Sequence, residues 1–385
     1  MSSNGRLTVL QSAASWLPQT QTWMYQQTRF LPDDVETHVV CDQTENLDQF
    51  GVPNIHCWST APLISRAWTK GLRLLGLRSH PYLVKVARRI GARIVHSHFG
   101  HIGWRDGRAA GLAGARHVVT FYGRDLGYMP RSDPRWKGRY QAMFAEVDRV
   151  LCEGPHMAGE IMALGCPEEK AVVHHLGIDL DVFEYRPRTW DGSGPLRVLL
   201  AGSFTEKKGL PYAIEALGRV KEAADVRVTI IGGASARPEM QREKQRILDA
   251  IRHSGLQERV RLLGYQTYER LLTEAYEHDV FLAPSVRAAD GDTEGGAPVT
   301  ILEMAATGMP VVSTRHADIP EVLPEGAGLL AEERDPEGLA AHLRHLIEHP
   351  ESWAPLTRAA RDHLEAEYDV RTQAARLAEL YRSLA

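Results

Sequence analysis

The sequence predicts an α/β protein with two doubly wound parallel sheets. Two observations indicate this: short runs rich in β-branched residues recur along the chain, and each is followed by a stretch with helical spacing of apolar residues. Runs that are apolar throughout suit strands buried on both faces of a parallel sheet. Their alternation with helices implies right-handed crossovers between parallel strands. A chain of 385 residues also has room for two domains.

The predicted strands form two series with a polar segment between them. The first series covers residues 6–11, 36–41, 93–99, 117–122, 149–152 and 172–175, and the second covers 196–202, 226–232, 260–264, 280–285, 310–314 and 328–331. The segment 186–195 (RPRTWDGSGP) is rich in proline, glycine and polar residues, which is typical of a linker. We therefore expect an N-terminal domain of residues 1–188 and a C-terminal domain of residues 189–369.

Composition excludes several classes of protein. Hydrophobic residues make up 43% and charged residues 24%, and the formal net charge is −4, so nothing in the overall charge indicates a nucleic-acid partner. The four cysteines are far apart, without the paired spacing of a metal site, and suit small core residues in a reducing compartment. No apolar run approaches the roughly 20 residues of a membrane span, and the start lacks a signal-peptide core. We expect a cytoplasmic protein.

The strongest candidate site is Gly291–Gly308 (GDTEGGAPVTILEMAATG), which follows a predicted strand. Pro298 suits the first turn of a helix over residues 299–307, and Gly308 suits its C-terminal stop. Ligands of doubly wound sheets bind beyond the carboxyl ends of the strands, where this segment lies. An ordinary capped surface helix is the structural alternative.

The chemistry of this segment suits a sugar nucleotide. Free amides at Val299 and Thr300, together with the helix dipole, form a site for a diphosphate. The carboxylates of Glu294 and Glu303 can accept hydrogen bonds from the diols of a sugar or a ribose. A second candidate, Ala201–Gly209 (AGSFTEKKG), places lysines directly after a strand, where they suit phosphate. Its structural alternative is a solvated basic turn.

Several ordered motifs give the chain a resemblance to the retaining family-4 glycosyltransferases of the GT-B fold. In the second half these are residues 202–209, the run PSVRAADGDTEGGAPVTILEMAATGMPVVST (284–314), HADIPEVL (316–323) and GAGLL (326–330). In the first half they are HSHFG (96–100), TFYGRD (120–125) and GIDLDVF (177–183), and PQTQTW (18–23) resembles a loop of exopolysaccharide and lipopolysaccharide branches. The resemblance covers most of the chain.

The resemblance implies roles for individual residues. Lys208 would neutralise donor phosphate, Glu294 would hold the transferring sugar, Glu303 the ribose, and Tyr265 would lie against the base. The implied donor site comprises Gly202, Ser203, Lys208, Tyr265, Arg287, Glu294, Gly295, Gly296, Thr300 and Glu303. The implied acceptor side comprises Gln19, Thr20, Tyr122, Arg124 and Asp125, with His98 as a further catalytic candidate beside Lys208 and Glu294. No metal and no cofactor is implied, and the final helix, about residues 370–385, would return to the first domain.

Three features depart from the family pattern. The family has arginine where this chain has Ser203, and Arg287, Lys207 or Arg124 could supply the missing cation. The two glutamates are nine positions apart (303 − 294 = 9) rather than eight, which a glycine bulge can absorb. The family often has histidine at the position of Tyr122.

The acceptor and the wider class stay open at this point. The strongly basic interval Arg66–Arg116 could lie on an anionic membrane surface, which would suit a lipid-linked acceptor, or it could form ordinary helices with arginines facing water. Nucleic acid is not expected, because no aromatic platform accompanies the charge. The acceptor would be a saccharide, a lipid-linked molecule or a small molecule, and the donor UDP- or GDP-linked. The alternatives are a non-catalytic sugar-nucleotide-binding relative and a GT-B epimerase.

Overall fold

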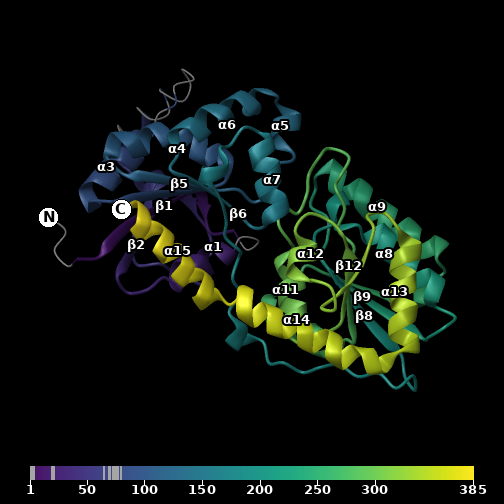
Figure 1. The fold of residues 1–385 in the computed structure, drawn as a ribbon. Coiled ribbons are helices and arrows are strands. Elements are labelled where there is room, and N and C mark those ends of the chain that lie inside the picture. The colour runs from purple at the N-terminus through teal and green to yellow at the C-terminus, as the bar shows by residue number, and fades with distance from the viewer. Residues whose placement is uncertain (1–4, 19–21, 64–65, 68–70, 72–77, 79) are drawn as a thin grey trace. The chain divides into compact units, whose positions relative to one another are not determined.

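The chain divides into two compact units. In the computed structural model the described residues are 5–18, 22–63, 66–67, 71, 78 and 80–385. Unit 1 comprises residues 1–179 with 367–385, and unit 2 comprises residues 180–366 (Figure 1). The segment 186–195 belongs to unit 2, where the backbone N–H groups of Arg186 and Arg188 donate to the carbonyls of Thr307 and Gly308. The sequence predicted domain limits at residues 188 and 369, whereas the two compact units meet at residues 179/180 and 366/367. The limits of independently folding domains stay a prediction.

Unit 1 is built on a parallel sheet that has seven strands within the described residues, in the order β3-β2-β1-β4-β5-β6-β7. The strands are β1 (Leu7–Trp16), β2 (Val35–Thr44), β3 (Ile55–Cys57), β4 (Ile94–His98), β5 (Arg116–Thr120), β6 (Arg149–Cys152) and β7 (Ala171–Val173). The sequence predicted all of these except β3, whose three residues are too few to show a pattern. Because β1 pairs with β4, the strand order reverses between them, and ligands of such sheets bind at this point.

The helices of unit 1 include one from the far end of the chain. They are α1 (Thr22–Arg29), α3 (Pro81–Ile90), α4 (Gly100–Ala113), α5 (Met129–Ser132), α6 (Arg135–Glu146), α7 (Pro155–Ala163) and α15 (Val370–Leu384), with the short 3₁₀ turns η2 (Trp58–Thr60) and η3 (Glu168–Lys170). In α15, Leu377 and Tyr381 are buried in one apolar cluster with Val9 of β1 and Ile94 of β4. The C-terminal helix therefore completes the core of unit 1.

Unit 2 repeats the architecture with a six-stranded parallel sheet in the order β10-β9-β8-β11-β12-β13. The strands are β8 (Leu196–Ala201), β9 (Val226–Ile231), β10 (Val260–Gly264), β11 (Val280–Ala283), β12 (Val311–Thr314) and β13 (Leu329–Ala331). The helices are α8 (Leu210–Val220), α9 (Pro238–His253), α10 (Tyr268–Glu277), α11 (Val299–Ala306), α12 (Ile319–Val322), α13 (Pro336–Glu348) and α14 (Trp353–Glu367), with 3₁₀ turns that include η5 (Glu206–Lys208). The order reverses between β8 and β11, so the segments that follow these two strands share the ligand edge of the sheet.

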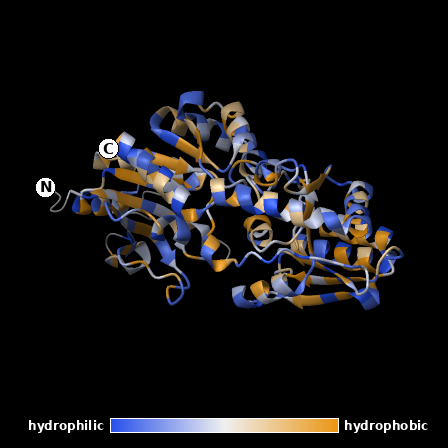
Figure 2. Ribbon diagram, turned by 60° about the horizontal axis from the view of Figure 1, so that its bottom comes forward, coloured by the Kyte–Doolittle hydropathy of each residue, from blue (hydrophilic) through white to orange (hydrophobic). Residues whose placement is uncertain are grey.

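Burial explains the strand sequences. Val198, Leu199 and Leu200 in β8 and Val280, Phe281 and Leu282 in β11 have no exposed surface, as a sheet covered on both faces requires. Figure 2 shows that the strands are mainly hydrophobic, whereas the helices alternate hydrophobic and hydrophilic residues. Within the described part of the chain, no helix combines the length and the apolar character needed to cross a membrane.

Candidate functional site

The loops after β8 and β11 meet closely at the edge of the unit 2 sheet. Lys208 lies in η5, the turn that follows β8, and Gly209 next to it has a φ of +61°. A Cβ atom at Gly209 would lie 1.9 Å from the carbonyl oxygen of Pro284, which follows β11. Only glycine allows both this backbone conformation and this approach. The glycine that ends the lysine loop therefore brings Lys208 against the end of β11.

The central feature of the site is an ion pair. The Nζ atom of Lys208 lies 3.0 Å from the carboxylate of Glu294, whose side chain is 6% exposed. The hydroxyl of Ser285 donates to the same carboxylate over 3.3 Å. Burial alone would raise the pKa of Glu294, but the charges of Lys208 and Lys207 outweigh it and lower the pKa. The site thus holds an ionised carboxylate and a lysine side by side.

A second lysine reinforces this pair. The Nζ atom of Lys207 donates to the carbonyl of Thr293 over 3.0 Å and lies 3.5 Å from the carboxylate of Asp292. It is also 4.0 Å from Glu294. Lys207, one of the three residues that could supply the cation missing at Ser203, therefore places its charge beside the ion pair. Of the other two, Arg287 binds Glu333 through its backbone N–H, and Arg124 is an exposed residue of unit 1.

The helix α11 carries the second glutamate. Pro298 is its N-cap rather than its first helical residue, so the helix begins at Val299 and its first turn presents backbone N–H groups. Glu303 lies in the next turn, and its carboxylate accepts a hydrogen bond of 3.1 Å from the hydroxyl of Tyr268. Burial raises the pKa of Glu303 to about 7, although the hydrogen bond from Tyr268 opposes the shift. Glu303 is therefore close to half-ionised at neutral pH.

Two glycines shape the loop between the glutamates. Gly295 has a φ of +83°, and the carbonyl of Gly296 accepts a hydrogen bond of 3.1 Å from the N–H of Asp318. A residue with a side chain would be strained at Gly295. The extra position between Glu294 and Glu303 thus lies in a loop whose glycine adopts a left-handed conformation, as a bulge requires.

Two residues that the sequence did not single out brace this loop. The ring of His316, which follows β12, lies 2.8 Å from the hydroxyl of Thr293 and 3.3 Å from the backbone nitrogen of Glu294, both measured to Nε2. The Nδ1 atom of the same ring lies 2.6 Å from the carboxylate of Glu333, which follows β13. His316 is 1% exposed, and burial lowers its pKa. Position in a family-like motif was the only sequence signal for His316, and Glu333 had none.

Tyr265 lies on the other side of the switch point. It follows β10, its side chain is 61% exposed, and its hydroxyl donates to the carbonyl of Gly233 over 2.9 Å. Gly233 follows β9, and a Cβ atom there would lie 3.2 Å from the Tyr265 ring. The ring is therefore an open aromatic surface at the same sheet edge.

The candidate residues of unit 1 form a buried polar chain. His98, at the end of β4, has Nδ1 2.6 Å from the hydroxyl of Tyr122 and Nε2 3.1 Å from Oε1 of Gln11. An amide oxygen can only accept, so Nε2 carries the proton and the Tyr122 hydroxyl donates to Nδ1. Burial lowers the pKa of His98 to about 3, so the ring is neutral. Through Gln11 the chain reaches the hydroxyl of Tyr381 in α15.

Asp125 anchors the loops after β4 and β5. Its carboxylate accepts backbone hydrogen bonds of 2.6 Å from Gly100 and 3.1 Å from Tyr122, and burial raises its pKa to about 6. The guanidinium of Arg124 lies 4.5 Å from the centre of the Tyr128 ring. Gln19 and Thr20, also expected on the acceptor side, lie outside the described residues.

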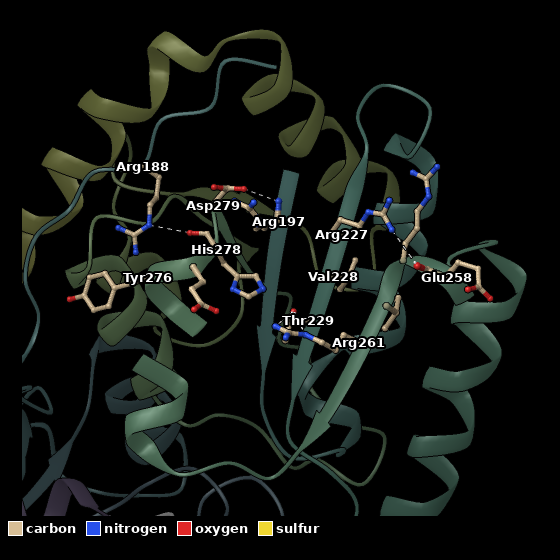
Figure 3. A pocket seen from close by; sticks show the side chains of 13 residues that line it. Arg188, Arg197, Arg227, Val228, Thr229, Glu258, Arg261, Tyr276, His278 and Asp279 are labelled. Atoms are coloured by element: carbon tan, nitrogen blue, oxygen red, sulfur yellow. Dashed lines mark hydrogen bonds between the residues drawn. The ribbon is translucent and has the colours of Figure 1, made fainter. Parts of the chain in front are cut away.

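A cavity elsewhere in unit 2 does not coincide with these groups. It has a volume of about 700 Å³ and is lined by residues at the amino ends of β8, β9 and β10, among them Arg197, Arg227 and Arg261 (Figure 3). Lys208 and Glu294 lie at the opposite, carboxyl edge of the sheet. The arginines of the cavity are largely engaged: Arg227 pairs with Asp225, and Arg261 pairs with the buried Glu274. We therefore place the candidate site at the carboxyl edge of the sheet.

Comparison with known proteins assigns the class. Residues 195–349 match the glycosyl transferases group 1, and residues 20–182 match glycosyltransferase family 4. The amylovoran biosynthesis glycosyltransferase AmsK of Erwinia amylovora is 34% identical over 292 residues, which are 75% of this chain and 69% of AmsK. The chain therefore belongs to the group 1 and family 4 glycosyltransferases.

More distant proteins agree with this class. A GDP-mannose-dependent phosphatidylinositol monomannoside mannosyltransferase of Mycolicibacterium smegmatis is 28% identical over 77% of this chain and 72% of its own length. Among solved structures, Anabaena HepE in complex with UDP-glucose superposes with a TM-score of 0.77 at 17% identity, covering 98% of this chain and 100% of HepE. Sucrose-phosphate synthase from Thermosynechococcus elongatus also reaches 0.77, at 16% identity over 98% of this chain and 99% of its own. These structures show that the fold is GT-B.

Proposed function

We propose that the chain transfers a sugar from a UDP- or GDP-linked donor to a saccharide or lipid-linked acceptor, with retention of the anomeric configuration. The observation that carries the proposal is the Lys208–Glu294 ion pair at the switch point of the unit 2 sheet. In a sugar nucleotide, the phosphate is bonded directly to the sugar. A cation for phosphate and a carboxylate for sugar hydroxyls should therefore stand next to each other, as Lys208 and Glu294 do.

The remaining groups of the site would each bind a different part of the donor: the ribose, the diphosphate or the base. Glu303, one helical turn inside α11, would accept hydrogen bonds from the two ribose hydroxyls. The N–H groups of the first turn of α11, at Val299 and Thr300, would bind the diphosphate with Lys208. Gly202 and Ser203, which follow β8, would let the diphosphate approach the backbone. Tyr265 would lie against the base. The exposed ring of Tyr265 and the position of Glu303 one turn after the free N–H groups of α11 support these roles.

The chemical step would need charge stabilisation more than a protein nucleophile. The bond between the anomeric carbon and the phosphate oxygen breaks, and the nucleoside diphosphate leaves with the electron pair. The acceptor hydroxyl attacks the same face of the sugar and passes its proton to the departing phosphate. Lys208 would stabilise the negative charge that develops on this phosphate. Metal independence is part of the same proposal.

The acceptor belongs to the proposal as well. His98 is the last residue of β4, and Tyr122 follows β5, so both lie at the ligand edge of the unit 1 sheet, which suits a sugar acceptor. Several basic residues of the interval 66–116 are exposed in the described structure: Lys85, Arg88, Arg89, Arg93 and Arg108. They would favour peripheral contact with an anionic inner membrane surface. Sedimentation with vesicles that contain anionic lipid, against neutral vesicles, tests this contact.

A thermal-shift panel tests the proposed donor site. UDP, GDP, ADP and their sugars are added to the wild-type protein and to the Lys208→Ala and Glu303→Ala variants. A ligand at 100 times its dissociation constant should stabilise the protein by about 2.7 kcal/mol. We expect one nucleotide to give a clear shift that both variants reduce. If both variants shift as much as the wild-type protein does, the donor site lies elsewhere.

Turnover separates an enzyme from a non-catalytic relative. The donor that gives the largest shift is incubated with the wild-type protein, and release of the nucleoside diphosphate is followed with and without saccharide acceptors. Transfer or donor hydrolysis above background supports the proposed enzyme. Tight donor binding without either would identify a sugar-nucleotide-binding protein instead.

A further inference from the structure

The loop that carries Glu294 is held by hydrogen bonds along its length, among them those from the N–H of Val286 to the carbonyl of Lys207, from Nζ of Lys207 to the carbonyl of Thr293, and from the N–H of Asp318 to the carbonyl of Gly296. It joins β11 to α11 over residues 284–298, all of which the structure describes, and none of them belongs to a helix or a strand. Within it, the N–H of Ala288 donates to the carbonyl of Asp292 over 2.9 Å, and the N–H of Gly291 donates back to Ala288. Neither bond holds the backbone of Glu294 itself. That backbone is bound through its N–H to the ring of His316.

Hydrogen-bond chemistry fixes the state of this ring. A backbone N–H can only donate, so the Nε2 atom of His316 must accept from Glu294 and carries no proton. The Nδ1 atom therefore carries the proton and donates it to Glu333 over 2.6 Å. The hydroxyl of Thr293 donates to Nε2 over 2.8 Å. The ring is thus a neutral connector with one donor nitrogen and one acceptor nitrogen, and a flip of the ring would break all three contacts.

Glu333 is held in turn. Its second carboxylate oxygen accepts the backbone N–H of Arg287 over 2.9 Å, and the guanidinium of Arg334 lies 3.4 Å away. Glu333, His316 and the Glu294 loop follow β13, β12 and β11, which are neighbours in the sheet. The connection therefore runs across three adjacent strand ends, and it fixes the position of the loop relative to the sheet.

We propose that His316, oriented by Glu333, is a positioning residue that fixes Glu294 against the transferring sugar. The inference rests on the proposed role of Glu294 in the donor site. The carboxylate of Glu294 meets Lys208 and Ser285 only if its backbone stays in place, and His316 holds that backbone. A displacement of about 1 Å at such a group can cost about a hundredfold in rate.

Two substitutions of His316 test the contributions of its two ring nitrogens separately. His316→Asn keeps a donor near Nδ1 for Glu333 but loses the acceptor for the Glu294 N–H. His316→Gln keeps an acceptor near Nε2 but loses the donor for Glu333. The readouts are kcat and KM for transfer, and the dissociation constants of the nucleoside diphosphate and of its sugar. His278→Asn is the matched control, since His278 is a buried histidine of the same unit that lines the cavity of Figure 3 at the opposite edge.

We expect His316→Asn to lower kcat about 10- to 100-fold and to weaken binding of the sugar nucleotide, with a smaller loss for His316→Gln. Binding of the nucleoside diphosphate should change less than about twofold, because Lys208 and Glu303 hold it. In a Glu294→Gln background, His316→Asn should add less than about threefold, since both changes disable the same group. Glu333→Gln should resemble His316→Gln, and His278→Asn should leave the kinetics unchanged.

The results that overturn the inference differ from those that overturn the donor site. If Glu294→Gln impairs transfer but His316→Asn does not, His316 has no positioning role and the donor site stands. If the losses of His316→Asn and Glu294→Gln multiply in full, or nucleoside diphosphate binding falls equally, His316 acts only on general stability. If Glu294→Gln transfers sugar like the wild type, the proposed role of Glu294 is wrong, and the inference about His316, which rests on it, is wrong as well.

Discussion

The ammonium group of Lys208 and the carboxylate of Glu294 lie 3.0 Å apart, although 86 residues separate them in the chain. The two side chains are 19% and 6% exposed, so neither charge has full access to water. Each charge therefore depends on the other for compensation. The arrangement lowers the pKa of Glu294 and holds the two side chains in place before any ligand arrives.

Removal of one member of this pair should cost stability. Lys208→Met leaves the Glu294 carboxylate with Lys207, whose Nζ atom is 4.0 Å away, as its nearest cation. We expect a loss of about 3 kcal/mol in the free energy of unfolding by urea, at the lower end of the range for broken buried pairs. The double variant Lys208→Met/Glu294→Gln should recover part of this loss, because no unpaired charge remains. Equal stability of the two variants would show that the pair is effectively solvated.

Binding of the nucleoside diphosphate should strengthen as pH rises through about 7. Ribose hydroxyls donate to the ionised form of Glu303, and burial raises the pKa of this carboxyl to about 7. Between about pH 6 and pH 8 the affinity should rise about tenfold. Isothermal titration calorimetry measures this dependence. Glu303→Gln should remove the part due to the carboxyl and leave the titration of the ligand phosphate. An unchanged pH dependence in that variant would contradict the assignment.

The same carboxyl should oppose folding at alkaline pH. Its pKa is raised in the folded state from an ordinary value of 4.5, so the stability it contributes is complete below about pH 4.5 and is lost as pH rises through about 7. Glu303→Gln carries no charge to bury. We expect the unliganded variant to exceed the wild type by about 2 kcal/mol at about pH 8 and to match it at about pH 5. Thermal unfolding of both proteins at both pH values checks this. If the stability difference between Glu303→Gln and the wild type is the same at both pH values, ionisation of Glu303 does not destabilise the fold.

The hydroxyl of Tyr381 should contribute to the stability of unit 1. It lies 2.6 Å from Nδ1 of His96 and accepts a hydrogen bond of 3.3 Å from Gln11, and all three groups are buried. Tyr381→Phe leaves two buried polar groups without this partner, at a cost of about 1–3 kcal/mol. Tyr276→Phe, which removes a hydroxyl near the surface of unit 2, should have a much smaller effect. A negligible change for Tyr381→Phe would mean that water replaces the hydroxyl.

The sequence predicted the parts of the fold that repeat. Strands such as β6 and β10 match their predicted ranges, because a run of four or five mainly apolar residues between turns is a strong local signal. The sequence also placed the segments of Lys208 and Glu294 after strands of one parallel sheet, although the contact between the two side chains came from the structure. Short β3 escaped prediction because three residues show no period.

Contacts between side chains of distant segments were not predictable in the same way. The hydrogen bond from Tyr268 to Glu303 and the connection from Glu333 through His316 to the Glu294 loop depend on the order β11-β12-β13 and on loop conformation. The sequence around His316 and around Glu333 contains no local pattern that indicates which residue each of them contacts. Asp125 was expected on the acceptor side, and the structure adds that its carboxylate binds two backbone N–H groups.

The most direct test of the donor site is a calorimetric titration of three proteins with the nucleoside diphosphate that the thermal-shift panel selects. The proteins are the wild type, Glu303→Gln and the control His278→Asn, at about pH 8, where Glu303 is ionised. We predict that Glu303→Gln binds about tenfold more weakly or worse while it remains folded, and that His278→Asn binds within about twofold of the wild type. Equal affinity of Glu303→Gln and the wild type would contradict the placement of the donor at the edge formed by β8, β11 and α11.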